Sequence, residues 1–314
     1  MSKLTYCLLG FLLFAAMLFG QGATGSSSVS GRVTDPSGAV IAGAMVTITD
    51  ISTSISKTTQ TNTSGLYLFN DVSSGLYDVA VTSPGFRKEV IRRQDVLVAT
   101  AITVNVALEV GGATEVVEVT AESGAELQTL NATMGQTITS EGLLELPTIN
   151  RDVSSLLFLQ PMTAPTFSAE GNVTSGQVAG NMSDQNSYFL DGGNSTSDFD
   201  GDNGTYVGSR SAVVPTPVES VEELRVNTNN MTADFGFSGG GQMLLSTKRG
   251  TNQYHGSLYD YFQSDVLSAS DWFNNFQGVG KPKSHYNRFG GSIGGPLTPN
   301  FLGGKTYIFL NYDI

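Results

Sequence analysis

The chain has 314 residues, a formal net charge of −12 at pH 7 and 37 glycines. This length predicts two or three domains, and an acidic chain without a basic stripe is excluded as a nucleic-acid-binding protein. Glycine is abundant and only 14% of the residues are charged, which favours turn-rich β structure over helices. We therefore expect a mainly β protein.

The amino terminus has the order of a secretory signal. Lys3 precedes the apolar run YCLLGFLLFAAMLFG, and small residues follow at GQGATGSSS. The apolar run is shorter than the about 20 residues of a membrane-spanning helix, so we predict a signal peptide over residues 1–23; a buried anchor helix is the alternative. The only cysteine, Cys7, lies in this segment, and the mature chain is therefore expected to rely on no disulfide.

Residues 26–110 contain short strands separated by turns. Side chains alternate between two faces with a period of two in SVSGRV, AMVTITD, GLYLFN, GLYDVAVT and AITVNVALEV, and turns such as TDPSGA lie between these stretches. This pattern predicts an antiparallel β-sandwich. The stretches GRVTDPSGAVIAGAMVTIT and TQTNTSGLYLFNDVSSGLYDVAVTSPGF resemble a carboxypeptidase regulatory-like domain, and that resemblance implies a transthyretin-like sandwich of carbohydrate-binding-like fold.

The family's name does not imply peptidase chemistry for this chain. The two histidines, His255 and His285, both lie outside the sandwich segment. Zinc hydrolysis needs about three clustered protein ligands and a carboxylate base. We therefore predict no catalytic residues, no metal centre, no cofactor and no enzymatic activity.

Residues 125–252 change in character and predict a mixed α/β domain. In SEGLLELPTINRDVSSLLFLQP the apolar spacing fits short helices, with Ser140 and then Asn150 or Asp152 as caps and with Pro147 and Pro161 ending them. SYFLDGGN predicts a strand running into a turn, VESVEELRVNTNN a short helix ending in a strand, and MLLST another strand.

The order of short motifs in this segment resembles the plug of a TonB-dependent outer-membrane receptor, particularly the Oar-like branch. LDG comes first, then VEELRV, an aromatic-glycine turn, a glycine run and finally TKRGTN. LRVNTNN stands where many plugs have EVLRGP, which favours the Oar-like branch over siderophore receptors. The plug-motif residues implied by the resemblance are Asp191, Gly192, Gly239, Gly240 and Gly241.

Residues 253–314 predict the first strands of an outer-membrane β-barrel. In YHGSLYDYFQS, Ser257, Tyr259 and Tyr261 alternate with Leu258, Asp260 and Phe262, while KTYIFLNYD places Ile308, Leu310 and Tyr312 on one side. Such aromatic alternation is typical of membrane barrels. About 60 residues supply roughly three or four strands of 9–11 residues, whereas transporters of this kind close with about 22. We therefore expect an incomplete barrel from a truncated product or gene fragment, unless a second chain completes it.

A lone acidic strand-forming segment, TEVVEVTAE, lies between the sandwich and the plug, within a predicted linker over residues 111–124. The family resemblance implies that it is the TonB box, which pairs with the periplasmic carboxy-terminal domain of TonB by strand addition. The predicted box residues are Glu115, Val116, Val117, Glu118, Val119 and Thr120. The alternative interpretation is a last strand of the sandwich or an extension of VNVALEV.

Asp198, Asp200 and Asp202 alternate in DFDGDNG and form a weak calcium candidate. An EF-hand loop needs Gly at its sixth position and Glu at its twelfth, but Asn203 and Ser209 stand there. The standard loop therefore fails, and a solvated plug loop is the simpler interpretation.

Together these features predict part of an outer-membrane TonB-dependent receptor that imports or senses an unidentified extracellular substrate with energy delivered by TonB. The resemblance implies an outer-membrane location with the amino-terminal domain in the periplasm, and the barrel would contact outer-membrane lipid. The alternative is a secreted or surface sandwich that binds a carbohydrate or protein without transport.

Overall fold

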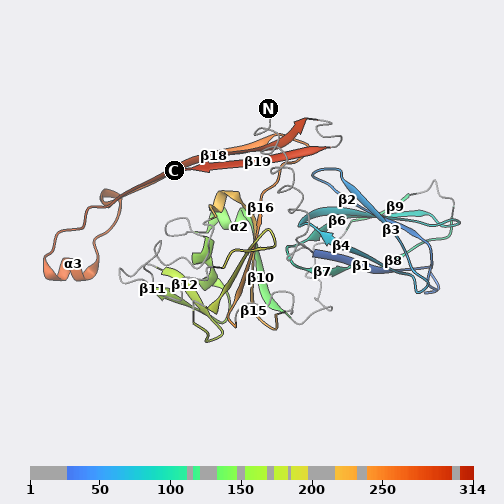
Figure 1. Ribbon diagram of the computed structural model, residues 1–314, viewed down its shortest axis with the longest axis horizontal. Helices are drawn as coiled ribbons and strands as arrows, with labels where there is room; N and C mark the ends of the chain where they lie inside the picture. Colours follow the sequence, from blue (N-terminus) through green and yellow to red (C-terminus); the bar gives the residue numbers. More distant parts are fainter. Residues whose placement is uncertain are drawn as a thin grey trace, which may run out of the picture.

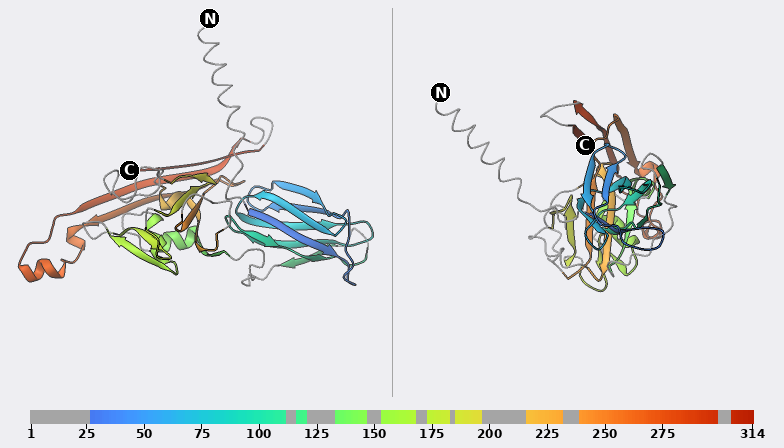
Figure 2. Two further views of the ribbon diagram at one scale, coloured as in Figure 1. Left: turned by 60° about the horizontal axis from the view of Figure 1, so that its bottom comes forward. Right: turned by 90° about the vertical axis from the view of Figure 1, so that its right-hand side faces the viewer.

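The computed structural model describes residues 27–111, 116–120, 133–146, 153–167, 173–182, 185–196, 216–231, 239–298 and 305–314. Within these ranges the chain forms a β-sandwich, a central mixed sheet with short helices, and a three-stranded antiparallel sheet (Figure 1). The sandwich lies at one end of the molecule, and the three-stranded sheet runs alongside the central sheet (Figure 2). The predicted signal peptide lies outside the described residues.

The sandwich contains two sheets that enclose one apolar core. One sheet has the order β4-β1-β7, with β8 also paired to β1, and the other has the order β3-β2-β5-β6-β9. The strands are β1 Ser27–Thr34, β2 Met45–Asp50, β3 Ser56–Gln60, β4 Leu66–Val72, β5 Gly75–Thr82, β6 Lys88–Val96, β7 Ala101–Thr103, β8 Val106–Ala107 and β9 Val116–Thr120. Side chains alternate along a strand, so Tyr67 and Phe69 are buried in the core while Leu66 and Leu68 are exposed, as predicted.

The expected antiparallel β-sandwich is confirmed for β1 with β4 and along β3-β2-β5-β6, but β7, β8 and β9 add parallel pairs. β1 pairs in parallel with β7 and with β8, and β6 pairs in parallel with β9. The predicted single strand AITVNVALEV is interrupted at Val104 and Asn105, because the Val104 carbonyl accepts the Tyr67 hydroxyl at 2.6 Å and the Asn105 side chain accepts the Arg32 backbone N–H at 3.0 Å. The sequence pattern also missed β3 and β6, whose many polar residues obscure their alternation.

The central sheet has the order β10-β15-β16-β13-β14. Its strands are β10 Met134–Thr139, β13 Ser187–Leu190, β14 Gly193–Asn194, β15 Val221–Asn229 and β16 Gln242–Thr247. The accompanying elements are the α-helix α2 Ser140–Glu145, the 3₁₀ helices η3 Val153–Leu159 and η5 Val218–Ser220, and the hairpin of β11 Thr163–Phe167 and β12 Val173–Val178. Apolar side chains from α2, η3, β12 and the sheet form a second core.

The structure refines three helix predictions in this region. Ser140 is the first residue of α2 rather than its cap; Thr139 occupies the cap position and makes no side-chain capping bond. The second predicted helix is the 3₁₀ helix η3, which ends before Pro161, and its predicted caps Asn150 and Asp152 lie outside the described residues, as does Pro147. The helix predicted in VESVEELRVNTNN is the single turn η5, because the following residues pair on both sides as β15.

The three-stranded sheet comprises β17 His255–Ser264, β18 His285–Thr298 and β19 Thr306–Asp313. Between β17 and β18 lie η7 Asp265–Leu267 and α3 Trp272–Gln277, at the end of the sheet far from the sandwich (Figure 1). Of the helices that the structure describes, none is both long enough and apolar enough to cross a membrane.

Candidate functional site

The predicted box segment forms a strand, and that strand belongs to the sandwich. β9 pairs in parallel with β6, with Cα partners running from Lys88 and Val116 to Arg92 and Thr120. This is the alternative that the sequence left open, in which the segment is the last strand of the sandwich. Glu115 lies outside the described residues, and the assignment of this strand to TonB binding stays a prediction.

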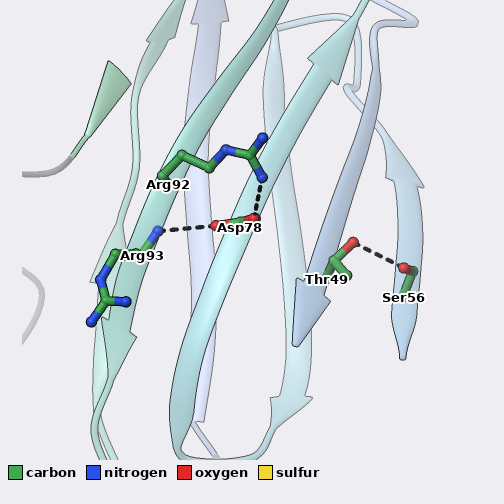
Figure 3. A network of polar contacts seen from close by, with 5 residues as sticks. All are labelled: Thr49, Ser56, Asp78, Arg92 and Arg93. Carbon is green, nitrogen blue, oxygen red and sulfur yellow. Dashed lines mark hydrogen bonds and ion pairs between the residues drawn. The ribbon is translucent and has the colours of Figure 1, made fainter. Parts of the chain in front are cut away.

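A bend in β6 lies directly after the last residue paired with β9. Arg93 has a positive φ of 57°, and the β5–β6 register shifts between Tyr77 and Val79. Figure 3 shows the Asp78 carboxylate between the two arginines. The Asp78 carboxylate accepts a hydrogen bond from the Arg92 guanidinium at 2.5 Å and another from the Arg93 backbone N–H at 3.1 Å. A bulge of this kind bends a strand and interrupts its ladder.

The predicted plug-motif residue Asp191 fastens a tight turn to the neighbouring strand. Asp191 and Gly192 have φ values of 47° and 82°, a region that Asp and Gly tolerate best. The Asp191 carboxylate accepts the Thr247 backbone N–H at 2.8 Å and the Thr247 hydroxyl at 2.7 Å. The turn between β13 and β14 is thereby tied to the end of β16, the last strand before β17.

The three predicted glycines have different surroundings. A Cβ on Gly240 would lie 2.4 Å from the Gln185 carbonyl oxygen, and one on Gly241 would lie 2.6 Å from the Val178 side chain. A Cβ on Gly239 would meet nothing within 4 Å. Close approach of the Gln185 backbone at Gly240 and of the Val178 side chain at Gly241 therefore favours glycine at the second and third positions of the run. The first position is unconstrained, a difference that the sequence did not show.

The sandwich contacts the central sheet through a buried carboxylate that the sequence analysis missed. Glu223 on β15 is 6% exposed, and its carboxylate accepts the Val98 backbone N–H at 2.8 Å. The pKa of Glu223 is raised from 4.5 to about 7, chiefly by burial; the hydrogen bond from Val98 and the charge of Arg249 oppose the rise, while the charges of Asp95 and Glu222 add to it. No sequence signal marked Glu223, because it stands in an ordinary polar position of VEELRV.

A second set of contacts joins the sandwich to the segment that enters β17. Arg249 donates to the Ser74 carbonyl, and the hydroxyls of Ser74 and Ser246 lie 3.2 Å apart. Nearby, the Asn252 backbone N–H donates to the Ser52 carbonyl at 3.0 Å. These contacts fix the end of the central sheet against the sandwich.

β19 also reaches the sandwich. The Tyr307 hydroxyl oxygen lies 2.8 Å from the Thr53 carbonyl oxygen and 2.6 Å from the Asn252 side-chain oxygen. A cavity of about 410 Å³ lies at this meeting of the three parts, and Asp50, Tyr77 and Arg249 are among its lining residues. The sandwich, central sheet and three-stranded sheet thus share one junction.

One face of the three-stranded sheet is largely apolar and exposed. Leu258 is 93% exposed, and large apolar side chains at register positions on the same face are also exposed. These are Phe262, Phe289, Ile293, Ile308, Leu310 and Tyr312. Asp260 shares this face by alternation. The predicted alternation of β17 and β19 is confirmed.

The opposite face of the same sheet is polar and internally bonded. Arg288 forms an ion pair with Asp313, the Tyr259 hydroxyl donates to the Asn311 side chain at 3.2 Å, and the hydroxyls of Ser257 and Ser292 lie 2.9 Å apart. Membrane strands alternate between lipid-facing apolar residues and lumen-facing polar residues, so this division suits a barrel wall.

Within the described ranges, no group of three or more His, Cys, Asp or Glu side chains is placed to hold a metal ion. The calcium candidates Asp198, Asp200 and Asp202 lie outside those ranges. The calcium site therefore stays a prediction.

Comparison with known proteins supplies two domain matches and a homologue along nearly the whole chain. Residues 28–109 match the family described as carboxypeptidase regulatory-like domain, and residues 246–314 match the outer membrane beta barrel domain. The TonB-dependent transporter Oar of Myxococcus xanthus is 24% identical over 97% of this chain and 29% of its own length. The chain thus spans less than a third of that relative.

Two solved structures show likeness at low identity. The siderophore receptor PirA from Acinetobacter baumannii is 22% identical, covers 57% of this chain and 24% of its own, and has a TM-score of 0.40. The wild-type catechol 1,2 dioxygenase of Acinetobacter radioresistens is 15% identical over 31% of this chain and 58% of its own, with a TM-score of 0.24. The chain is thus similar near its start to a carboxypeptidase regulatory-like domain, near its end to an outer membrane beta barrel domain, and along nearly its whole length to a TonB-dependent transporter.

Proposed function

We propose that this chain serves in an outer-membrane receptor that imports or senses an extracellular substrate with energy delivered by TonB, and that it acts in transport rather than catalysis. The homologue over 97% of the chain is a TonB-dependent transporter, which supports this assignment. In this proposal the sandwich lies in the periplasm, where it can meet TonB.

The division of faces in the three-stranded sheet supports the proposal most directly. Exposed side chains such as Leu258 and Leu310 occupy one face, while the ion pair of Arg288 with Asp313 occupies the other. Apolar surface of this extent is unfavourable in water but suits hydrocarbon. The backbone groups of adjacent strands are paired with one another, as a membrane strand requires.

The connections between the parts support a route for mechanical work. β9 belongs to the sandwich, and Glu223 joins the sandwich to the central sheet. Within that sheet, Asp191 ties the β13–β14 turn to the end of β16. A pull on β9 is therefore applied to elements that contact the plug. Rearrangement of the plug would then admit substrate to the periplasm.

Binding of a synthetic peptide of residues 111–124 to the carboxy-terminal domain of TonB tests the partner assignment. We expect saturable binding, and we expect Val117→Pro to abolish it because proline removes a backbone donor and disfavours the paired strand. Glu118→Gln keeps every backbone donor and serves as the matched control, with affinity within about threefold. Absence of binding by both the unmodified peptide and the complete chain would refute the assignment.

A further inference from the structure

We propose that the sandwich presents the box strand to TonB without releasing it. β9 remains paired with β6, and a strand of TonB adds to the opposite edge of β9, so the five-stranded sheet becomes an intermolecular sheet. This inference rests on the proposed function, because it concerns how the same segment meets the same partner. It assigns the sandwich the role of a rigid platform for the box.

The position of β9 in its sheet permits this addition. The sheet order is β3-β2-β5-β6-β9, so β9 is its outermost strand among the described residues. Backbone N–H and C=O groups of a strand point alternately to its two sides. Pairing with β6 therefore engages one edge of β9 and leaves the other edge directed away from the sandwich, as in other cases of strand addition.

A bend in β6 lies directly after the last described pair of the β6–β9 ladder. The last register pair is Arg92 with Thr120, and Arg93 in the next position has left-handed backbone geometry. Asp78 on β5 holds both the Arg92 side chain and the Arg93 N–H (Figure 3). The described ladder between β6 and β9 covers five residue pairs in one register, which keeps Val116–Thr120 extended.

Holding the strand extended favours association. A free peptide must lose backbone freedom when it becomes a strand, whereas β9 has already lost it in the sandwich. Preorganisation of this kind raises affinity mainly by lowering the entropy lost on binding. Release from β6 would undo that benefit and would also break the existing ladder. We therefore expect the complete chain to bind at least about tenfold more tightly than the free peptide.

A reversible crosslink between β6 and β9 tests whether the strand stays in place. Glu89 and Val117 are Cα partners in the parallel ladder. Neighbouring strands lie about 4.8 Å apart, which is within the Cα separation that a disulfide spans. The full chain carries Glu89→Cys and Val117→Cys, with Cys7 changed to Ser so that the new pair is the only one. Its affinity for the TonB carboxy-terminal domain is measured oxidised and reduced, beside the Val117→Cys single variant and the 111–124 peptide.

We expect the disulfide to form, and the oxidised chain to bind at least as tightly as the reduced chain and more tightly than the peptide. Loss of binding on oxidation with recovery on reduction would overturn the inference, because the strand would then have to leave β6; peptide binding would still uphold the proposed function. Failure of the disulfide to form would also overturn it, by contradicting the register. If neither peptide nor chain binds, the proposed function fails together with the inference.

Discussion

The buried carboxylate of Glu223 makes the contact between the sandwich and the central sheet sensitive to pH. Its folded-state pKa of about 7 exceeds the ordinary 4.5, so between these values the docked state binds a proton that the separated or unfolded state lacks. Stability that depends on this group therefore falls as pH rises through the interval, and it is recovered as pH falls. The sign is opposite to that of a carboxylate held in an ion pair.

The size of the effect follows from the same two values. From pH 5 to pH 8 the linkage relation gives about a 70-fold weakening of the contact, equivalent to about 2–3 kcal/mol. The group is almost fully buried, with 6% exposure, so little discount for solvent screening applies. Replacement Glu223→Gln removes the charge and keeps a side-chain oxygen that can accept from Val98.

Hydrogen exchange read by mass spectrometry provides the assay, because the Val98 N–H is the donor to Glu223. After correction for intrinsic exchange rates, we expect protection of the segment around Val98 to fall by about 50–100-fold from pH 5 to pH 8 in the native chain. The Glu223→Gln variant should show a flat profile. Glu222→Gln, at the adjacent exposed position, removes only a minor contribution to the Glu223 pKa and should keep most of the native pH dependence. The same pH profile in the native chain and in Glu223→Gln would refute the reasoning.

Three further predictions concern the plug and the three-stranded sheet. Gly240→Ala should destabilise the plug by about 1–3 kcal/mol because its Cβ meets backbone, whereas Gly239→Ala should be close to neutral; denaturant unfolding compares them, and equal losses would contradict the geometry. Asp191→Ala should cost about 1–2 kcal/mol in the same measurement through the lost bonds to β16, and an unchanged midpoint would count against the role of this turn. Leu258→Arg should destabilise the membrane-inserted sheet by about 2–4 kcal/mol if the position lies near mid-membrane, and so lower the yield of heat-modifiable outer-membrane protein. Ser257→Arg, on the other face, should lower that yield less. A lower yield for Ser257→Arg than for Leu258→Arg would contradict the assigned faces.

Local alternation carried much of the strand prediction. Leu66 and Tyr67 in β4, and Leu258 and Tyr259 in β17, face opposite sides of their strands, as their sequence spacing indicated, because strand periodicity is a local property. The sequence pattern did not predict β6, because charged residues occupy both faces of that strand and obscure the alternation. Its parallel partner β9 was predicted as a strand without a partner, since parallel pairing joins segments distant along the chain.

The candidate site likewise contains features that the sequence predicted and features that it did not. The turn at Asp191 followed from residue types that tolerate positive φ. Gly239 and Gly240 look alike in the sequence, and only the approach of the Gln185 carbonyl separates them. Glu223 could not be found from sequence, because its burial depends on the loop at Val98 from another domain. The site features that the sequence did not predict therefore depend mostly on contacts between segments that are distant in sequence.

The central claim is that the chain is part of an outer-membrane receptor, with its three-stranded sheet in the barrel wall. The location of the protein in native membranes tests this claim most directly. Antibodies against the sandwich and plug would be used to blot outer-membrane and periplasmic fractions of the source cells, with and without boiling. We predict an outer-membrane band whose mobility shifts on heating, as expected of a closed barrel. A band confined to the soluble periplasmic fraction and unaffected by heat would contradict the account.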